Sequence, residues 1–152
     1  MTVEEFRDVV GLWHVDRRSA ADVVRAACDL LVAGVDGPAM SRLAAASVRT
    51  ADDEVPLLLE DAMTEVGLEH HHLGSDGGLE AGVRAMARLT LAGELSPREL
   101  ARWAHRWCGH DRLELADGLA LLDDVYDERE LAGLTEEDVD EEVLAEVRRI
   151  TA

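Results

Sequence analysis

Residues 96–108 read SPRELARWAHRWC and set the class of fold for the whole chain. Ser96 and Glu99 have the capping-box spacing, in which each side chain bonds the other residue's backbone amide at a helix start. Pro97 occupies the first helical position, where an amide hydrogen would have no partner in the helix. One face of the expected helix is apolar and consists of Leu100, Trp103, Ala104, Trp107 and Cys108. The opposite face carries the arginines Arg98, Arg102 and Arg106. The stretch predicts an amphipathic helix with both tryptophans in the core, and exposed partner anchors are the alternative.

The same signals recur along the chain. Thr2 with Glu5 and Ser19 with Asp22 repeat the capping-box spacing, and Pro38 repeats the proline start. Glycines typical of helix ends follow apolar runs at Gly34, Gly67, Gly93 and Gly109. Further residues with helical spacing are expected to face inward: Val83, Met86, Leu89, Leu119, Leu122, Tyr126, Val139, Val143, Val147 and Ile150. With only 3% aromatic residues, we predict an all-α fold, a compact bundle of about seven or eight short helices.

A shift of 59 residues aligns similar features in the two halves of the chain. It places Val24-Arg25-Ala26 on Val83-Arg84-Ala85 and Pro38 on Pro97. Either a duplication or the biased composition explains these matches. The sequence thus predicts one helical domain over residues 1–152, in which related halves 1–68 and 79–152 would be joined by the aperiodic linker 69–78.

The charge of the chain favours one class of partner. Aspartate and glutamate number 33 against 15 basic residues, for a formal net charge of -18. This charge repels nucleic acid and anionic membranes, whereas it attracts a basic protein. The two cysteines lie in apolar helical runs, and no apolar segment at the amino terminus resembles a signal or a membrane span. We therefore expect a cytoplasmic protein with a basic protein partner.

Two patterns are candidates for metal chemistry. Residues 123–128, DDVYDE, match the aspartate-rich motif with which helical isoprenoid synthases hold magnesium, but a short chain with few aromatics is poorly suited to enclose such a substrate. His105, Cys108 and His110 are weak candidates for zinc ligands, because their spacing matches no zinc motif. No nucleophile or phosphate-loop motif is present. We expect no enzymatic activity and no cofactor, and a small metal-binding enzyme is the alternative.

Two segments resemble the acidic helical immunity proteins of the colicin D type. They are Leu91 to Leu100 with the tryptophan-bearing helix that follows, and the acidic closing helix from Asp138 to Arg149. The resemblance implies a monomer or homodimer that blocks a nuclease toxin by presenting carboxylates to its basic RNA groove. The carboxylates expected to bind this partner are Asp123, Asp124, Asp127, Glu128, Glu130, Glu136, Glu137 and Asp138. A helical adaptor that binds through an apolar patch is the alternative, and its complex would resist salt.

Overall fold

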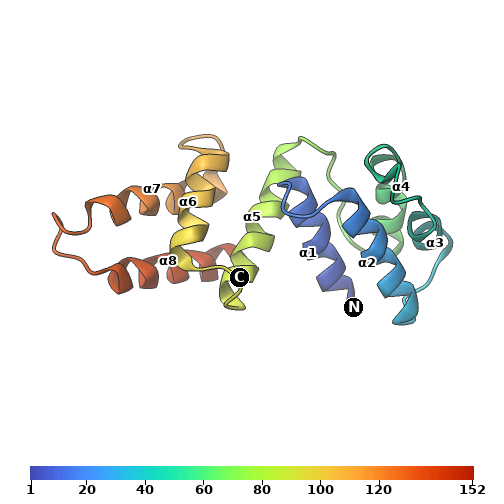
Figure 1. Ribbon diagram of the computed structural model, residues 1–152, viewed down its shortest axis with the longest axis horizontal. Helices are drawn as coiled ribbons and strands as arrows, with labels where there is room; N and C mark the ends of the chain where they lie inside the picture. Colours follow the sequence, from blue (N-terminus) through green and yellow to red (C-terminus); the bar gives the residue numbers. More distant parts are fainter. The chain divides into compact units, whose positions relative to one another are not determined.

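The protein is built from helices alone. The computed structural model describes residues 1–152, of which 70% are helical, and contains no strand. Figure 1 shows the eight helices: α1 (Val3–His14), α2 (Ala20–Val32), α3 (Pro38–Ala44), α4 (Ala51–Glu65), α5 (Asp76–Leu91), α6 (Pro97–Cys108), α7 (Glu114–Glu128) and α8 (Glu136–Thr151). The prediction of an all-α fold is confirmed.

The local signals that start and end helices act as predicted. Capping boxes with both hydrogen bonds begin α1, α2 and α6 at Thr2, Ser19 and Ser96. Gly34, Gly67, Gly93 and Gly109 all have positive φ angles beyond helix ends. A fourth capping box, Thr135 with Asp138, begins α8 and was not among the predicted ones. Local side-chain chemistry therefore sets the helix boundaries.

The chain divides into two compact units, Met1–Gly82 and Val83–Ala152, here called unit 1 and unit 2. The division falls within α5. The predicted duplication stays a prediction. No helix combines the length and the apolar character needed to cross a membrane.

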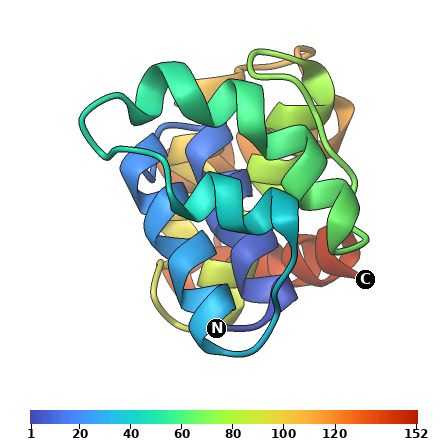
Figure 2. The same cartoon turned by 90° about the vertical axis from the view of Figure 1, so that its right-hand side faces the viewer.

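Unit 1 encloses an apolar core among its first four helices. In this unit α2 contacts α1, α3 and α4, and Figure 2 looks onto the unit from the side of α3 and α4. The core contains fully buried side chains from each of these helices, including Phe6, Val23, Leu30, Met40, Leu43, Val55 and Leu59. Burial of this apolar surface is the main force that holds the short helices together.

Glu65, at the end of α4, caps the start of α3. Its carboxylate accepts hydrogen bonds from the backbone amides of Ala39 at 3.0 Å and Met40 at 2.9 Å. These backbone bonds lower the pKa of the Glu65 carboxyl. Gly37, the N-cap residue, provides no side-chain bond, and a Cβ atom there would lie 2.3 Å from the Glu65 carboxyl carbon. Glycine therefore leaves room for a cap that comes from another helix.

Glu65→Ala should lower the melting temperature of the protein by a few degrees at pH 7, because the first turn of α3 loses its acceptor. The folded-state pKa lies below the ordinary glutamate value, so the stabilisation is present at neutral pH. It is lost as the pH falls through the folded-state pKa. Thermal unfolding at neutral and acid pH measures the effect. Glu60→Ala, an equal loss of charge on the same helix, should change little, and an equal effect of both variants would contradict the cap.

The predicted linker leads directly into α5. Ser75 Oγ accepts a hydrogen bond from the Gly78 amide at 3.1 Å, which caps the first turn. Gly77 and Gly78 lie against the rings of His71 and His14, where a Cβ atom would approach the Nδ1 atoms to 2.3 and 2.5 Å. Burial, together with His71 and His70, lowers the pKa of His14 to about 4. His14 is therefore neutral at pH 7.

Unit 2 contains a bundle in which α6, α7 and α8 contact one another. The predicted inward face of α8 is confirmed, since Val139, Val143, Val147 and Ile150 are all buried. Small buried residues on the facing helices, such as Ala101, Ala104 and Ala120, let α6 and α7 approach closely. Tyr126 on α7 is fully buried, as predicted.

The prediction that Trp107 packs in the core is wrong. Its side chain is 45% exposed, and its ring stacks on that of Trp103 with centroids 6.3 Å apart. The buried face of α6 is formed by Leu100, Ala101, Ala104 and Cys108. The helix is thus rotated toward Ala101 relative to the predicted stripe, and this rotation carries Trp107 outward.

Candidate functional site

Unit 2 displays a group of exposed carboxylates where α7 ends and α8 begins. We call this group the acidic end, and its six exposed members are Asp127, Glu128, Glu130, Glu136, Glu137 and Asp138. They belong to the last turn of α7, the connecting loop and the first turn of α8. The two helices lie side by side in Figure 1, so their ends bring the two carboxylate runs together.

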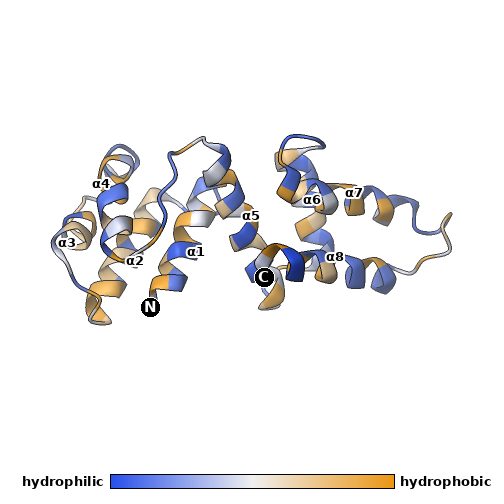
Figure 3. Cartoon of the chain, turned by 180° about the vertical axis from the view of Figure 1, so that it is seen from behind, coloured by the Kyte–Doolittle hydropathy of each residue, from blue (hydrophilic) through white to orange (hydrophobic).

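The loop between α7 and α8 is an ordered turn that exposes a leucine. The Leu134 amide bonds the Arg129 carbonyl at 2.8 Å, and the Leu131 amide bonds the Glu128 carbonyl at 3.1 Å. Gly133 has a φ of 72°, a left-handed conformation that glycine adopts without strain. Leu131 is 94% exposed. Figure 3 shows the hydrophobic colour at this loop between the largely hydrophilic outer turns of α7 and α8.

Arg98 of α6 joins the two sides of the acidic end. Its Nη1 atom lies 3.4 Å from Glu136 Oε1, and its Nη2 atom lies 3.9 Å from Asp127 Oδ1. Its guanidinium carbon lies 5.3 Å from the centre of the Tyr126 ring, within cation–π range. Helical spacing predicts that Arg98 lies on the polar face of α6, away from the core. Instead it is half-buried, because the first turn of α6 contacts the ends of α7 and α8.

The Tyr126 ring that packs against Arg98 is itself held by a partly buried hydrogen bond. The Tyr126 hydroxyl donates to a carboxylate oxygen of Asp140 on α8. Burial, followed by this bond to Asp140, raises the pKa of the Tyr126 hydroxyl, which therefore stays protonated and remains a donor. The bond links α7 to α8 beneath the acidic end.

Negative charge dominates the acidic end. Its six exposed carboxylates face two nearby arginines, Arg98 and Arg129, and Arg129 directs Nη1 to the Tyr126 carbonyl at 2.7 Å. Asp138 accepts a bond from the Thr135 amide at 2.8 Å, and this bond lowers the pKa of its carboxyl. The Asp138 carboxylate is therefore ionised at neutral pH.

Two of the carboxylates predicted to bind a partner, Asp123 and Asp124, lie apart from the acidic end. Asp123 Oδ2 lies 2.8 Å from His105 Nδ1, and only 16% of the Asp123 side chain is exposed. The packing of α6 against α7 turns this carboxylate toward α6. The Asp123 side chain is thus largely covered, and its role in partner binding stays a prediction. Because Asp127 lies beside Arg98 instead, the aspartate-rich run does not converge on one point.

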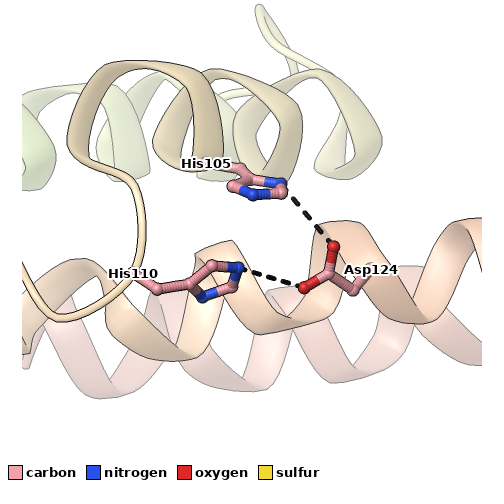
Figure 4. A group of neighbouring side chains, drawn as sticks. All are labelled: His105, His110 and Asp124. Atoms are coloured by element: carbon pink, nitrogen blue, oxygen red, sulfur yellow. Dashed lines mark ion pairs between the residues drawn. The ribbon is translucent and has the colours of Figure 1, made fainter.

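Asp124 lies between two histidines, as Figure 4 shows. Asp124 Oδ2 lies 3.1 Å from His110 Nε2, and Asp124 Oδ1 lies 3.8 Å from His105 Nδ1. The two imidazole centroids are 4.6 Å apart. One ligand atom from each of the three residues lies within 4.8 Å of the others. This His–His–Asp cluster has the donor types and proximity of a metal site.

Gly109 and Asp111, both with positive φ angles, turn the chain after α6 and carry His110 back toward Asp124. Of the three weak metal candidates, His105 and His110 belong to the cluster and Cys108 does not. Cys108 is buried, and burial raises the pKa of its thiol. Asp124 was considered as a metal ligand only within the aspartate-rich run, and its grouping with the histidines was not predicted, because helix packing and not sequence spacing brings it to them.

No known family, curated protein or solved structure matches the chain. The acidic end and the His–His–Asp cluster are the two features of the chain that point to a function.

Proposed function

We propose that this is a binding protein that uses the acidic end to bind a cationic partner protein. One observation carries the proposal: six exposed carboxylates surround an ordered turn whose leucine is 94% exposed. Charge at this position would steer a basic surface toward the protein. Burial of the exposed leucine by a partner would add an apolar contact to the charged ones.

The acidic end is suited to binding because its backbone is already ordered. Arg98 contacts Glu136 and Asp127, the Tyr126–Asp140 bond lies beneath, and the capping box holds the first turn of α8. A surface that is ordered before binding loses less conformational entropy when a partner docks. The carboxylate oxygens would accept hydrogen bonds from arginine and lysine side chains, as phosphate oxygens do.

The finer proposal is that the partner is a nuclease toxin and that this protein is its cytoplasmic immunity protein. It rests on the resemblance of two segments to colicin D-type immunity proteins and on the net charge of -18. On this proposal, the acidic end covers the basic groove in which the toxin would hold RNA. The adaptor alternative instead places the contact on exposed apolar side chains such as Leu121 and Trp107.

Affinity capture from cells of the source organism tests the proposal with three baits. One bait is the wild-type protein, and one carries substitutions in the acidic end, Glu128→Gln, Glu130→Gln and Glu137→Gln. The third is a control with the same net charge, substituted on exposed residues of α4: Asp53→Asn, Glu60→Gln and Asp61→Asn. We expect one basic protein to be retained by the wild type and the control, and to be lost with the acidic-end variant.

The captured protein is then purified and assayed for cleavage of RNA and DNA. The immunity proposal expects nuclease activity that stoichiometric wild-type protein inhibits. A partner without nuclease activity would contradict immunity but leave the acidic-end proposal standing. Equal retention by all three baits would contradict the acidic-end proposal itself.

A further inference from the structure

We propose that His105, His110 and Asp124 form a zinc-binding site in unit 2. The site is separate from the acidic end, so its failure would leave the proposed function intact. The three residues come from α6, the turn after α6, and α7. One ligand atom of each lies within 4.8 Å of the other two. Ligands around a tetrahedral zinc ion are separated by roughly 3.3 Å, given metal–ligand distances of about 2.0 Å. Small side-chain rotations would close the difference.

The donor set favours zinc among the common metal ions. Two imidazole nitrogens with one carboxylate oxygen suit zinc better than calcium or magnesium, which prefer oxygen ligands alone. The carboxylate also supplies negative charge to balance the cation. His110 is exposed and Asp124 is half-buried, so both are reachable from solvent. A metal ion can therefore enter without unfolding the helices.

A contact between Asp123 and the His105 ring sets the tautomer of that histidine. With Asp123 Oδ2 at 2.8 Å, the carboxylate accepts the Nδ1 hydrogen of His105. In this tautomer the lone pair lies on Nε2, the nitrogen that would bind zinc, whereas the nitrogen that lies 3.8 Å from Asp124 Oδ1 is Nδ1. Zinc binding would therefore require a rotation of the His105 ring that brings Nε2 to the ion. A carboxylate that fixes the second nitrogen of a ligating histidine is a common partner of zinc sites. Asp123 is thus a positioning residue and not a ligand.

An open pocket lies beside the cluster and provides space for further ligands. Its volume is about 390 Å³, and it is lined by His110, Asp111, Asp117, Leu121 and Asp124. Three protein ligands leave at least one coordination position of zinc free. Water from this pocket would fill that position.

The test is a titration of the metal-free, full-length protein with zinc chloride, followed by calorimetry. Titration with cobalt(II), whose visible absorption reports coordination geometry, provides an independent readout. We expect one ion per chain, with saturation at micromolar concentrations and the absorption of a four-coordinate cobalt site. His110→Ala and Asp124→Asn should each weaken zinc binding at least about tenfold, because each removes one of three ligands. Circular dichroism establishes that the variants are folded.

The matched control is the double substitution His71→Ala and His72→Ala, which removes two histidines from unit 1. It should leave the affinity and the cobalt spectrum unchanged. Asp123→Ala should weaken zinc binding about 10- to 100-fold, whereas Asp123→Asn, which keeps an acceptor oxygen, should recover most of the affinity. The zinc site would be ruled out by an absence of saturable binding, or by binding that survives His110→Ala and Asp124→Asn. Loss of binding in the control would equally overturn it.

Discussion

Tyr126→Ala should lower the unfolding free energy of unit 2 by about 3–5 kcal/mol, the usual cost of deleting a buried aromatic ring. Tyr126 is fully buried, and its ring lies beneath the Arg98 guanidinium. Its hydroxyl also links α7 to Asp140 of α8. The variant loses apolar contacts, leaves a cavity and also removes a partly buried hydrogen bond. Its effect should therefore exceed that of any substitution on the surface of α7.

Urea unfolding followed by circular dichroism measures this loss, and hydrogen exchange in α6, α7 and α8 assigns it to unit 2. Leu121→Ala is the matched control, because Leu121 lies on the same helix and is 57% exposed. It should change stability by less than about 0.5 kcal/mol. Tyr126→Phe should cost about 1–2 kcal/mol, since it removes only the hydrogen bond. A Tyr126→Ala variant as stable as Leu121→Ala would contradict the described core.

The combined variant Glu128→Gln, Glu130→Gln and Glu137→Gln should weaken binding of the purified cationic partner about 100-fold. We expect each neutralised carboxylate at the contacted surface to cost about 1 kcal/mol of binding free energy. Three such losses raise the dissociation constant by roughly two powers of ten. The substitutions preserve side-chain size, so the expected loss comes from charge. Calorimetric titration of the partner measures it.

The α4 variant, Asp53→Asn, Glu60→Gln and Asp61→Asn, distinguishes the effect of charge at the acidic end from the effect of the net charge of the chain. It carries the same net charge as the acidic-end variant but leaves the acidic end intact. We expect its affinity to stay within about threefold of the wild type, since distant exposed charges are largely screened at physiological salt. Equal weakening in both variants would show that only net charge matters, and the acidic end would then have no special role.

Local chemistry made the helices predictable from the sequence. The start of α6 is marked by the capping box of Ser96 with Glu99 and by the proline that follows Ser96. Neither signal depends on tertiary structure. The buried face of α8, with Val139 and Val147, follows from helical spacing alone. The fourth capping box at Thr135 was equally readable, because aspartate can replace glutamate as the partner side chain.

The arrangement of the candidate sites depends on helix packing, which spacing does not reveal. Asp123 and Asp124 are adjacent in sequence, yet Asp123 contacts only His105 closely, whereas Asp124 lies between His105 and His110. Arg98 was assigned to the polar face of α6, but the ends of α7 and α8 surround it. A small rotation of α6 also exposes Trp107 in favour of buried Ala101. Each of these features follows from the relative placement of helices.

The most direct test of the central claim is the dissociation constant of the wild-type protein and its purified partner, measured at increasing sodium chloride. The Debye length falls from about 10 Å at 0.1 M to about 3 Å at 1 M salt, so contacts between exposed charges weaken steeply over this range. If the acidic end binds the partner, the dissociation constant should rise at least about tenfold. A constant that stays level across the same range would contradict the claim and favour an apolar adaptor surface.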